Sequence, residues 1–375
     1  MNGLVIWTHS DCRSMMGVYR AIIEQLDTHV VMASWSIQDG ENKISSRRRL
    51  GFNRDEFSDI ELIPVGENWE KGKELIETYP GYHHLFGVYQ NAPTFRRLII
   101  EAHAQGGRVG ILSEAPCVMT SGLLGKIKKW LYLPLIVKNR IRKVVQATDF
   151  IANLSGDSSV SMRSIGWPLE KIVPFGYFPP PLIGSKKCTR DYDYNFNILV
   201  TGIMAWHRGP DVVIRALILL KKWGIRCRAI FTQTGPLFAK LQQQAIRYEL
   251  EVSFVGFLPL AELTQLYETC SLFVAAGRSE PWGMRLNDAL QCGMPIAVSR
   301  GMGGVQMVDE YGCGFSFEAD DELDLASKLR AVIQNKNKYL EYVRQAQCAA
   351  KLISPERKTK EFIETVNARF NRWFE

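Results

Sequence analysis

The sequence predicts an α/β protein built from two domains, each with a parallel sheet covered by helices. Two observations indicate this class. Short, strongly apolar runs alternate with helical patterns along the whole chain, which is typical of strands that helices cover on both faces. The length of 375 residues is also sufficient for two domains with separate cores.

The strand candidates are apolar runs bounded by glycine, proline or polar residues. In the first half of the chain they lie at 4–10, 29–36, 60–66, 83–89, 108–114, 150–155 and 171–177. In the second half they lie at 196–204, 227–235, 252–258, 272–277 and 295–299. The helical segments between them imply right-handed β-α-β units.

The segment 179–195 opens with three prolines and continues with polar residues that have no periodicity. Such a composition is typical of a linker. It divides the chain into an N-terminal domain at 1–185 and a C-terminal domain that begins at 186. Ligands of open α/β sheets bind beyond the carboxyl ends of the strands, so two such domains would form a cleft.

Composition excludes several classes of function. The net charge of +7 is spread evenly over both halves, which argues against a dedicated nucleic-acid face. The eight cysteines occur singly, without the paired spacing of a structural zinc site, and indicate a reducing compartment. No basic leader and no apolar run of about 18–20 residues is present, so we expect a cytoplasmic protein that at most touches a membrane.

The stretch at 279–288 reads SEPWGMRLND and places Glu280 and Asp288 on either side of Gly283. Gly283 is expected to start a helix that ends near Gly293. The first amides of such a helix, at Gly283 and Met284, would form a phosphate site, while carboxylates accept hydrogen bonds from sugar hydroxyls. This combination suits a nucleotide-sugar.

This stretch resembles the Glu-x7-Glu element of the family-4 (group 1) retaining glycosyltransferases, which have the GT-B fold. The resemblance continues through QCGMP (291–295), GMGGVQMV (301–308) and YGCGFSFEADD (311–321), and it covers residues 195–335 well. Residues 1–180 match only in layout, apart from KIVPFGYF (171–178). The implied fold has two Rossmann-like α/β/α domains that face each other across a cleft. The donor domain would be 186–357, and a helix at about 358–375 would pack back onto the acceptor-side domain at 1–185.

The resemblance implies roles for residues of the second domain. Glu280 would orient the transferred sugar, and Asp288, where the family usually has glutamate, would hold the ribose. Arg208, in the stretch GIMAWHRG (202–209), takes the place of the family's lysine and would bind the diphosphate. Ile203 takes the place of an arginine, and either His207 or Arg285 would have to supply the missing cation. The predicted site residues of this domain are Glu280 and Arg208 as catalytic and Trp282, Gly283, Met284 and Asp288 as donor-binding.

In the first domain, the loop HSDCRSMMG (9–17) follows the first strand, and Gly17 is expected to let an amide approach the diphosphate. Ser113 and Glu114, at the end of the fifth strand, are candidates for the acceptor side together with His9. The resemblance implies no covalent enzyme intermediate and no metal or other cofactor, and the chain has no Asp-x-Asp motif.

Between Glu114 and Asp149 the sequence has no acidic residue. The stretch at 126–143 combines seven Lys and Arg with an eight-residue apolar run. Basic amphipathic segments of this kind bind anionic membrane surfaces, so we expect contact through Lys126, Lys128, Lys129 and Trp130. Pro134 is expected to break the segment into two helices.

These observations favour a retaining glycosyltransferase of surface polysaccharide (O-antigen- or capsule-like) biosynthesis. Its donor would be a UDP-sugar or a GDP-sugar, and its acceptor a hydroxyl of a glycan or lipid-linked glycan. A GT-B nucleotide-sugar epimerase, a catalytically silent nucleotide- or glycan-binding module and a surface-associated scaffold are the alternatives. A dinucleotide-binding fingerprint at 301–306 is excluded, because Gln306 stands where the third glycine is needed.

Overall fold

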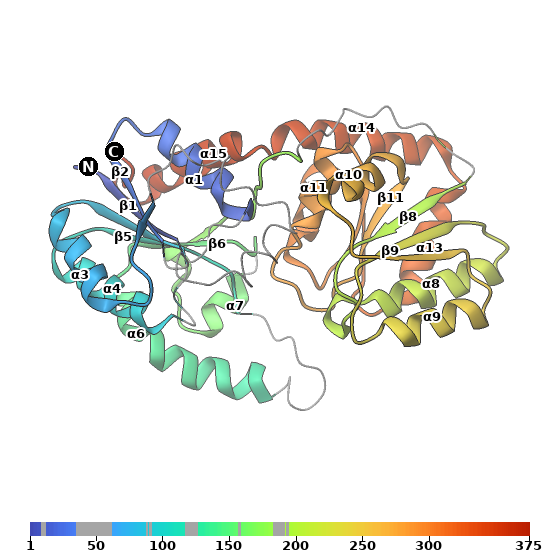
Figure 1. Ribbon diagram of the computed structural model, residues 1–375, viewed down its shortest axis with the longest axis horizontal. Helices are drawn as coiled ribbons and strands as arrows, with labels where there is room; N and C mark the ends of the chain where they lie inside the picture. Colours follow the sequence, from blue (N-terminus) through green and yellow to red (C-terminus); the bar gives the residue numbers. More distant parts are fainter. Residues whose placement is uncertain are drawn as a thin grey trace. The chain divides into compact units, whose positions relative to one another are not determined.

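The computed structural model describes residues 1–8, 13–34, 62–87, 89, 92–116, 127–156, 159–182, 192 and 195–375. The chain forms two compact units, which Figure 1 shows coloured along the sequence. Unit 1 comprises Met1–Pro180 and Pro355–Glu375, and unit 2 comprises Pro181–Ser354. The division therefore falls a few residues before the position at 185/186 expected from the linker.

Unit 1 has a parallel sheet that, in the described residues, has the order β3-β2-β1-β4-β5-β6-β7. Its strands are β1 (Leu4–Thr8), β2 (Val30–Ser34), β3 (Leu62–Pro64), β4 (His83–Phe86), β5 (Val109–Ser113), β6 (Phe150–Asn153) and β7 (Ile172–Pro174). Its helices are α1 (Arg13–Gln25), α3 (Trp69–Thr78), α4 (Pro93–Ala104), η2 (Lys128–Val137), α6 (Lys138–Gln146), α7 (Ser159–Ser164), η3 (Leu169–Lys171) and α15 (Pro355–Arg369). Helices α1 and α15 pack together on one face, and α3, α4 and α6 cover the other (Figure 1).

Unit 2 has a parallel sheet of order β10-β9-β8-β11-β12-β13. Its strands are β8 (Asn197–Val200), β9 (Arg228–Thr232), β10 (Val252–Gly256), β11 (Leu272–Ala275), β12 (Ile296–Ser299) and β13 (Gly314–Phe317). Its helices are η4 (Trp206–Arg208), α8 (Pro210–Lys222), α9 (Phe238–Arg247), α10 (Leu260–Thr269), α11 (Arg285–Gln291), η5 (Gly303–Val305), α12 (Gln306–Tyr311), α13 (Glu322–Ile333) and α14 (Lys336–Leu352). Helices α8, α9 and α13 cover one face, and α10, α11 and α14 cover the other (Figure 1).

The apolar runs fold as strands because both faces of each sheet are covered. All five residues of β1 and of β5 are buried, and so are all four residues of β12. Buried apolar strands of this kind are characteristic of parallel sheets between helix layers. All the strands predicted from the sequence are present, with shorter bounds.

Strand β13 was missed in the sequence, because its Gly-Phe-Ser-Phe run is short, begins with Gly314 and follows Gly312 closely. The structure explains the glycine that opens it. A Cβ atom on Gly314 would lie 1.8 Å from the carbonyl oxygen of Ile296 in β12, so no side chain fits there. The strand is paired with β12 from Ile296↔Gly314 to Ser299↔Phe317.

The predicted break at Pro134 is wrong. The helical backbone runs from η2 directly into α6, and η2 is wound as a π-helix with Pro134 inside it. The amide of Lys138 donates to the carbonyl of Leu133, five residues earlier, and these wider turns accommodate the proline ring. Among the described residues, no helix has the length and apolar character needed to cross a bilayer.

Candidate functional site

The order of the sheet in unit 2 reverses between β8 and β11, which are hydrogen-bonded neighbours although two other strands separate them in the sequence. Ile198 and Leu199 of β8 pair with Leu272 and Phe273 of β11. The loops that follow these two strands therefore leave the same edge of the sheet side by side. This point of reversal is where open α/β sheets bind their ligands.

The two residues predicted to be catalytic meet at this point. Arg208 ends the single helical turn η4 after β8, and Glu280 lies in the loop after β11. A guanidinium nitrogen of Arg208 donates a hydrogen bond to Glu280 Oε1 in an ion pair. The Arg208 side chain is 39% exposed and that of Glu280 12%, so the arginine retains N–H groups for a ligand.

Gly209 allows this approach. Its φ of +64° lies in the left-handed region, and it is the residue before α8. A Cβ atom on Gly209 would lie 1.9 Å from the carbonyl oxygen of Ala276, which follows β11. The two loops thus touch backbone to backbone, and only glycine fits between them.

The loop that carries Glu280 is held by the glycine-rich loop after β12. The amide of Glu280 donates to the carbonyl of Gly301 at 3.1 Å, and the amide of Gly303 donates to the carbonyl of Glu280 at 3.0 Å. A Cβ atom on Gly304 would lie 2.6 Å from the carbonyl oxygen of Trp282. The glycines at 301–304 therefore support the backbone around Glu280.

The sequence suggested that helix α11 begins at Gly283, but the helix begins at Arg285. Gly283 has a φ of +98° and belongs to the turn before the helix. In the described part of the chain, the amides of Gly283 and Met284 have no hydrogen-bond acceptor, so both remain available to a phosphate. The helix ends at Gln291, and Gly293, with a φ of +65°, caps it as predicted.

Trp282 is a core residue. Its side chain is 1% exposed, and its indole N–H donates to the Asn287 side chain at 2.9 Å. In this buried position the Trp282 ring cannot contact a nucleotide-sugar directly. Trp282 instead anchors the turn that presents Gly283 and Met284.

Asp288 is also buried, at 2% exposure. A carboxylate that binds the ribose was expected to be accessible to the ligand. Arg285 donates to its carboxylate at 3.0 Å. Burial alone would lower the pKa of Arg285, but Tyr267 and Asp288 outweigh burial and raise it. Tyr267 is fully buried, and its hydroxyl lies 3.5 Å from that of Thr201 at the end of β8. A donor would have to displace Arg285 from Asp288 to reach the carboxylate.

His207 does not supply a second cation at neutral pH. Burial lowers its pKa below the ordinary value of 6.5, and the adjacent Arg208 lowers it further against the opposing effect of Glu280. Ile203, in the place where the resemblance led us to expect an arginine, is 45% exposed. Arg285 remains the candidate for an additional positive charge.

Sequence reasoning missed Arg278, which lies two residues before Glu280 with its side chain only 7% exposed. It forms ion pairs with Asp211 and Asp320. No spacing pattern marked these residues, because they come from three segments that only the fold brings together. The position of Arg278 beside Glu280 was the one available signal.

The remaining predicted site residues belong to unit 1. Gly17 is inside α1, not in the loop before it, and a Cβ atom there would lie 3.0 Å from the side chains of Pro180 and Pro355. Its small size is thus explained by packing. Ser113 ends β5 and is buried, and Glu114 follows it and is exposed.

His9 and Lys126 lie outside the described residues. Lys128, Lys129 and Trp130 are placed by their backbone in η2.

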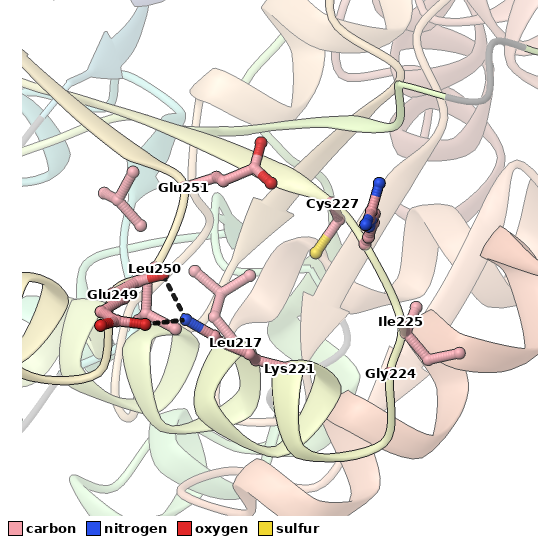
Figure 2. Close-up of a pocket in the computed structure, with 10 residues that line it drawn as sticks. Leu217, Lys221, Gly224, Ile225, Cys227, Glu249, Leu250 and Glu251 are labelled. Carbon is pink, nitrogen blue, oxygen red and sulfur yellow. Dashed lines mark hydrogen bonds and ion pairs between the residues drawn. The ribbon is translucent and has the colours of Figure 1, made fainter.

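A cavity of about 350 Å³ lies at the opposite edge of unit 2, lined by Leu217 and Lys221 of α8 and by residues that lead into β9 and β10. Figure 2 shows the Lys221 ammonium group donating to the backbone carbonyl and the carboxylate of Glu249. The carbonyl of Tyr248 is a third acceptor. Burial raises the pKa of the Cys227 thiol to about 12, with a contribution from Glu251. Because its lining residues lie at the other edge of the sheet, the cavity is separate from the loops that carry Arg208 and Glu280.

Within the described ranges, no group of three or more His, Cys, Asp or Glu side chains is arranged to hold a metal ion. Metal independence remains a prediction.

Residues 189–348 match the family model of the "Glycosyl transferases group 1". This segment belongs to that family. It contains Arg208, Glu280 and Asp288, so the site described above lies wholly within the group 1 segment.

Curated relatives are similar to part of the chain. An uncharacterized glycosyltransferase of Methanocaldococcus jannaschii is 27% identical over 38% of this chain and 40% of its own length. A GDP-mannose-dependent α-(1-6)-phosphatidylinositol dimannoside mannosyltransferase of Mycobacterium tuberculosis is 25% identical over 40% of this chain and 41% of its own. The chain thus matches about two fifths of the length of these relatives.

Solved structures extend the similarity of fold to both units. HepE of Anabaena in complex with UDP covers 98% of this chain with a TM-score of 0.68 at 16% identity, and all of that chain is matched. The apo form of the lipopolysaccharide outer core galactosyltransferase WaaB covers 98% with a TM-score of 0.68 at 13% identity, and is also matched in full. The chain has the GT-B fold of two Rossmann-like α/β units.

Proposed function

We propose that the protein is a retaining glycosyltransferase that transfers a sugar from a nucleotide-sugar to a hydroxyl group of a glycan or lipid-linked glycan. The observation that carries the proposal is the ion pair of Arg208 with Glu280 at the point where the strand order of unit 2 reverses. It places a cation with unused N–H groups beside a carboxylate. A diphosphate requires the first, and the hydroxyls of a sugar require the second.

The reaction breaks the bond between the anomeric carbon and the diphosphate oxygen and forms a bond from that carbon to the acceptor oxygen on the same face. The proton of the acceptor hydroxyl passes to the departing diphosphate. Arg208 and the amides of Gly283 and Met284 would stabilise the negative charge that develops on the leaving group. Glu280 would accept hydrogen bonds from the transferred sugar and hold its orientation.

A UDP-sugar is the favoured donor, since HepE, a protein similar in fold, holds UDP. The Mycobacterium relative is named for GDP-mannose, so a GDP-sugar is the alternative to test. We assign the product to surface polysaccharide or glycolipid synthesis at the inner face of the membrane. A catalytically silent module would bind the same nucleotides without releasing a nucleoside diphosphate.

Contact with an anionic membrane is the second part of the proposal. Ile127, just before η2, and the residues Leu131, Tyr132, Leu135 and Ile136 of η2 expose apolar side chains. Basic residues follow along the same helical path, with Lys138, Arg140, Arg142 and Lys143 exposed. Apolar side chains beside exposed cations suit the interface of a bilayer that carries negative lipids.

Thermal-shift titration with UDP, GDP, ADP and their sugar conjugates, with and without EDTA, tests the donor site. A nucleotide at about 100 times its dissociation constant adds about 2.7 kcal/mol to the free energy of unfolding, a clear shift in Tm. We expect a selective response that EDTA does not change. No response to any nucleotide would contradict the proposal.

The selected sugar conjugate is then used to measure release of nucleoside diphosphate with wild type and Glu280→Gln. The substitution keeps the size of the side chain but removes the negative charge. We expect a loss of about 10²-fold or more, as for removal of one preorganised electrostatic contact. Wild-type turnover by the variant would remove Glu280 from the site.

A further inference from the structure

Arg278 links the two loops that carry Arg208 and Glu280. Its backbone amide donates to the carbonyl of His207 at 2.8 Å, and its side chain donates to the carbonyl of Trp206 at 2.6 Å. Its guanidinium carbon lies 5.1 Å from the centre of the Trp206 ring. Arg278 thus contacts the short turn before Arg208 in three ways, while lying two residues before Glu280 in its own loop.

The guanidinium group is itself held firmly. It donates to both carboxylate oxygens of Asp211, at 2.9 and 2.6 Å, and to Asp320 at 2.7 Å. Asp211 in turn accepts from Arg215 at 2.7 Å. The planar guanidinium matches a carboxylate with two parallel bonds, which fixes direction as well as distance.

The charges in this cluster support one another. Burial alone would raise the pKa of Asp211, but the hydrogen bonds from Arg278 and Arg215 outweigh it and lower that pKa. Burial alone would likewise lower the pKa of Arg278, and its bonds to Asp211 and Asp320 reverse the direction. Both groups therefore stay charged over the range in which the enzyme would work.

The turn η4 needs such support. It consists of Trp206–Arg208, and so short a helical turn has little stability of its own. The pair of Arg208 with Glu280 does not supply it, because a partly exposed ion pair contributes little.

We propose that Arg278 is a positioning residue that sets the location of Arg208 relative to Glu280, and so prepares the site for a diphosphate. The inference rests on the proposed function. Arg278 would touch neither donor nor acceptor, because its side chain is 7% exposed, its two terminal nitrogens donate to Asp211, Asp320 and Trp206, and its Nε is buried.

A double-mutant cycle separates this role from a general effect on stability. UDP and GDP are each titrated calorimetrically into wild type, Arg278→Lys, Arg208→Ala and the double variant. Lysine keeps the charge but cannot bind Asp211 with two bonds and Trp206 at once. We expect Arg278→Lys to weaken binding of the nucleotide that wild type prefers by about tenfold, the value of one charge-assisted hydrogen bond. In the Arg208→Ala background the same change should cost less than about twofold, because the residue that it positions is gone.

Arg215→Lys is the matched control. Arg215 bonds to the same Asp211 and Asp320 and to Glu322, and no hydrogen bond or ion pair of the described structure joins it to the turn 206–208 or to Glu280. It should leave the affinity within about twofold of wild type.

Equal losses with Arg215→Lys and Arg278→Lys, or additive losses in the cycle, would overturn the inference. Wild type that binds neither nucleotide would instead count against the proposed function. If Arg278→Lys fails to fold, Asp211→Asn replaces it, with the same dependence on Arg208 expected.

Discussion

At the scale of single residues, the pairing of Arg208 with Glu280 shows how one site can offer a cation to a diphosphate and a carboxylate to sugar hydroxyls. The ion pair brings a cation and a carboxylate together, with the Arg208 side chain 39% exposed and that of Glu280 12% exposed. Asp288 is different, because Arg285 covers it and the fold buries it. The sequence assigned both carboxylates to the donor from one motif, whereas in the structure the Glu280 side chain is 12% exposed and that of Asp288 only 2%.

His84 provides a test of the fold at the residue scale. It is 2% exposed in β4, where it accepts a hydrogen bond from the Trp7 indole at 3.2 Å. Burial, with a smaller contribution from His83, lowers its pKa from 6.5 to about 3. Between these two values the unfolded chain binds a proton that the folded chain does not. Stability should therefore fall as the pH is lowered from 6.5 towards 3, by about 3 kcal/mol at pH 4.5 from this residue.

The variant His84→Gln keeps an acceptor for Trp7 and does not titrate in this range. Urea unfolding of wild type and variant at pH 7 and pH 4.5 should show a pH dependence that is smaller in the variant by about that amount. His103→Gln, at an exposed position of α4, serves as the control for the replacement of a histidine by glutamine. The same pH dependence in His84→Gln and wild type would contradict the assignment.

At the scale of elements, the site depends on a contact between two loop backbones. Gly209 has a φ of +64° and faces the carbonyl of Ala276, where an added Cβ would stand 1.9 Å away. Gly224 has a φ of +73°, and a Cβ there would meet nothing within 4 Å. The two glycines share a backbone conformation and differ in the space around them.

Gly224→Ala should therefore cost about 1–2 kcal/mol in the free energy of unfolding, the cost of a left-handed residue with a side chain. Gly209→Ala should cost more than about 3 kcal/mol, because the loops must also separate. Urea denaturation followed by circular dichroism measures both values. Nucleotide affinity should fall in Gly209→Ala only, and equal stabilities of the two variants would show that the close approach has no energetic role.

Most strands could be predicted because a strand that is buried on both faces of the sheet needs a continuous apolar run, and such runs are visible in the sequence. The exceptions are elements and residues that are determined by tertiary contacts and not by a pattern in the sequence. Strand β13 has too few apolar residues to stand out, and Gly17 is small because Pro180 and Pro355 press on α1. Arg208 and Glu280 were predictable from local motifs. Arg278 was not, because its partners Asp211 and Asp320 come from distant segments.

At the scale of the whole molecule, each unit has its own sheet and core, and the chain ends return to unit 1. Trp373 is fully buried there, and its indole donates to Asp149 at 3.0 Å. Arg108 donates to the carbonyl of Asn371 at 3.1 Å. The C-terminal segment is therefore part of the unit that also carries η2 and α6.

The exposed apolar side chains of η2 yield the prediction for the molecule as a whole. Leu131 and Leu135, one helical turn apart, are 54% and 58% exposed, which costs free energy in water unless a partner covers them. Leu131→Glu combined with Leu135→Glu should lower binding to vesicles of anionic lipid by at least about tenfold, since burying one leucine contributes about 1.5–3 kcal/mol. Co-sedimentation at increasing lipid concentration measures the change.

Val160→Glu is the control for that experiment. Val160 is 76% exposed in α7 of the same unit, so the substitution adds a negative charge to the surface at another place. Weaker binding only in the η2 variant would locate the membrane contact at that helix. Equal weakening in both would mean that added negative charge alone repels the lipid. Unchanged binding in both would place the contact elsewhere, and the apolar side chains of η2 would then need a protein partner.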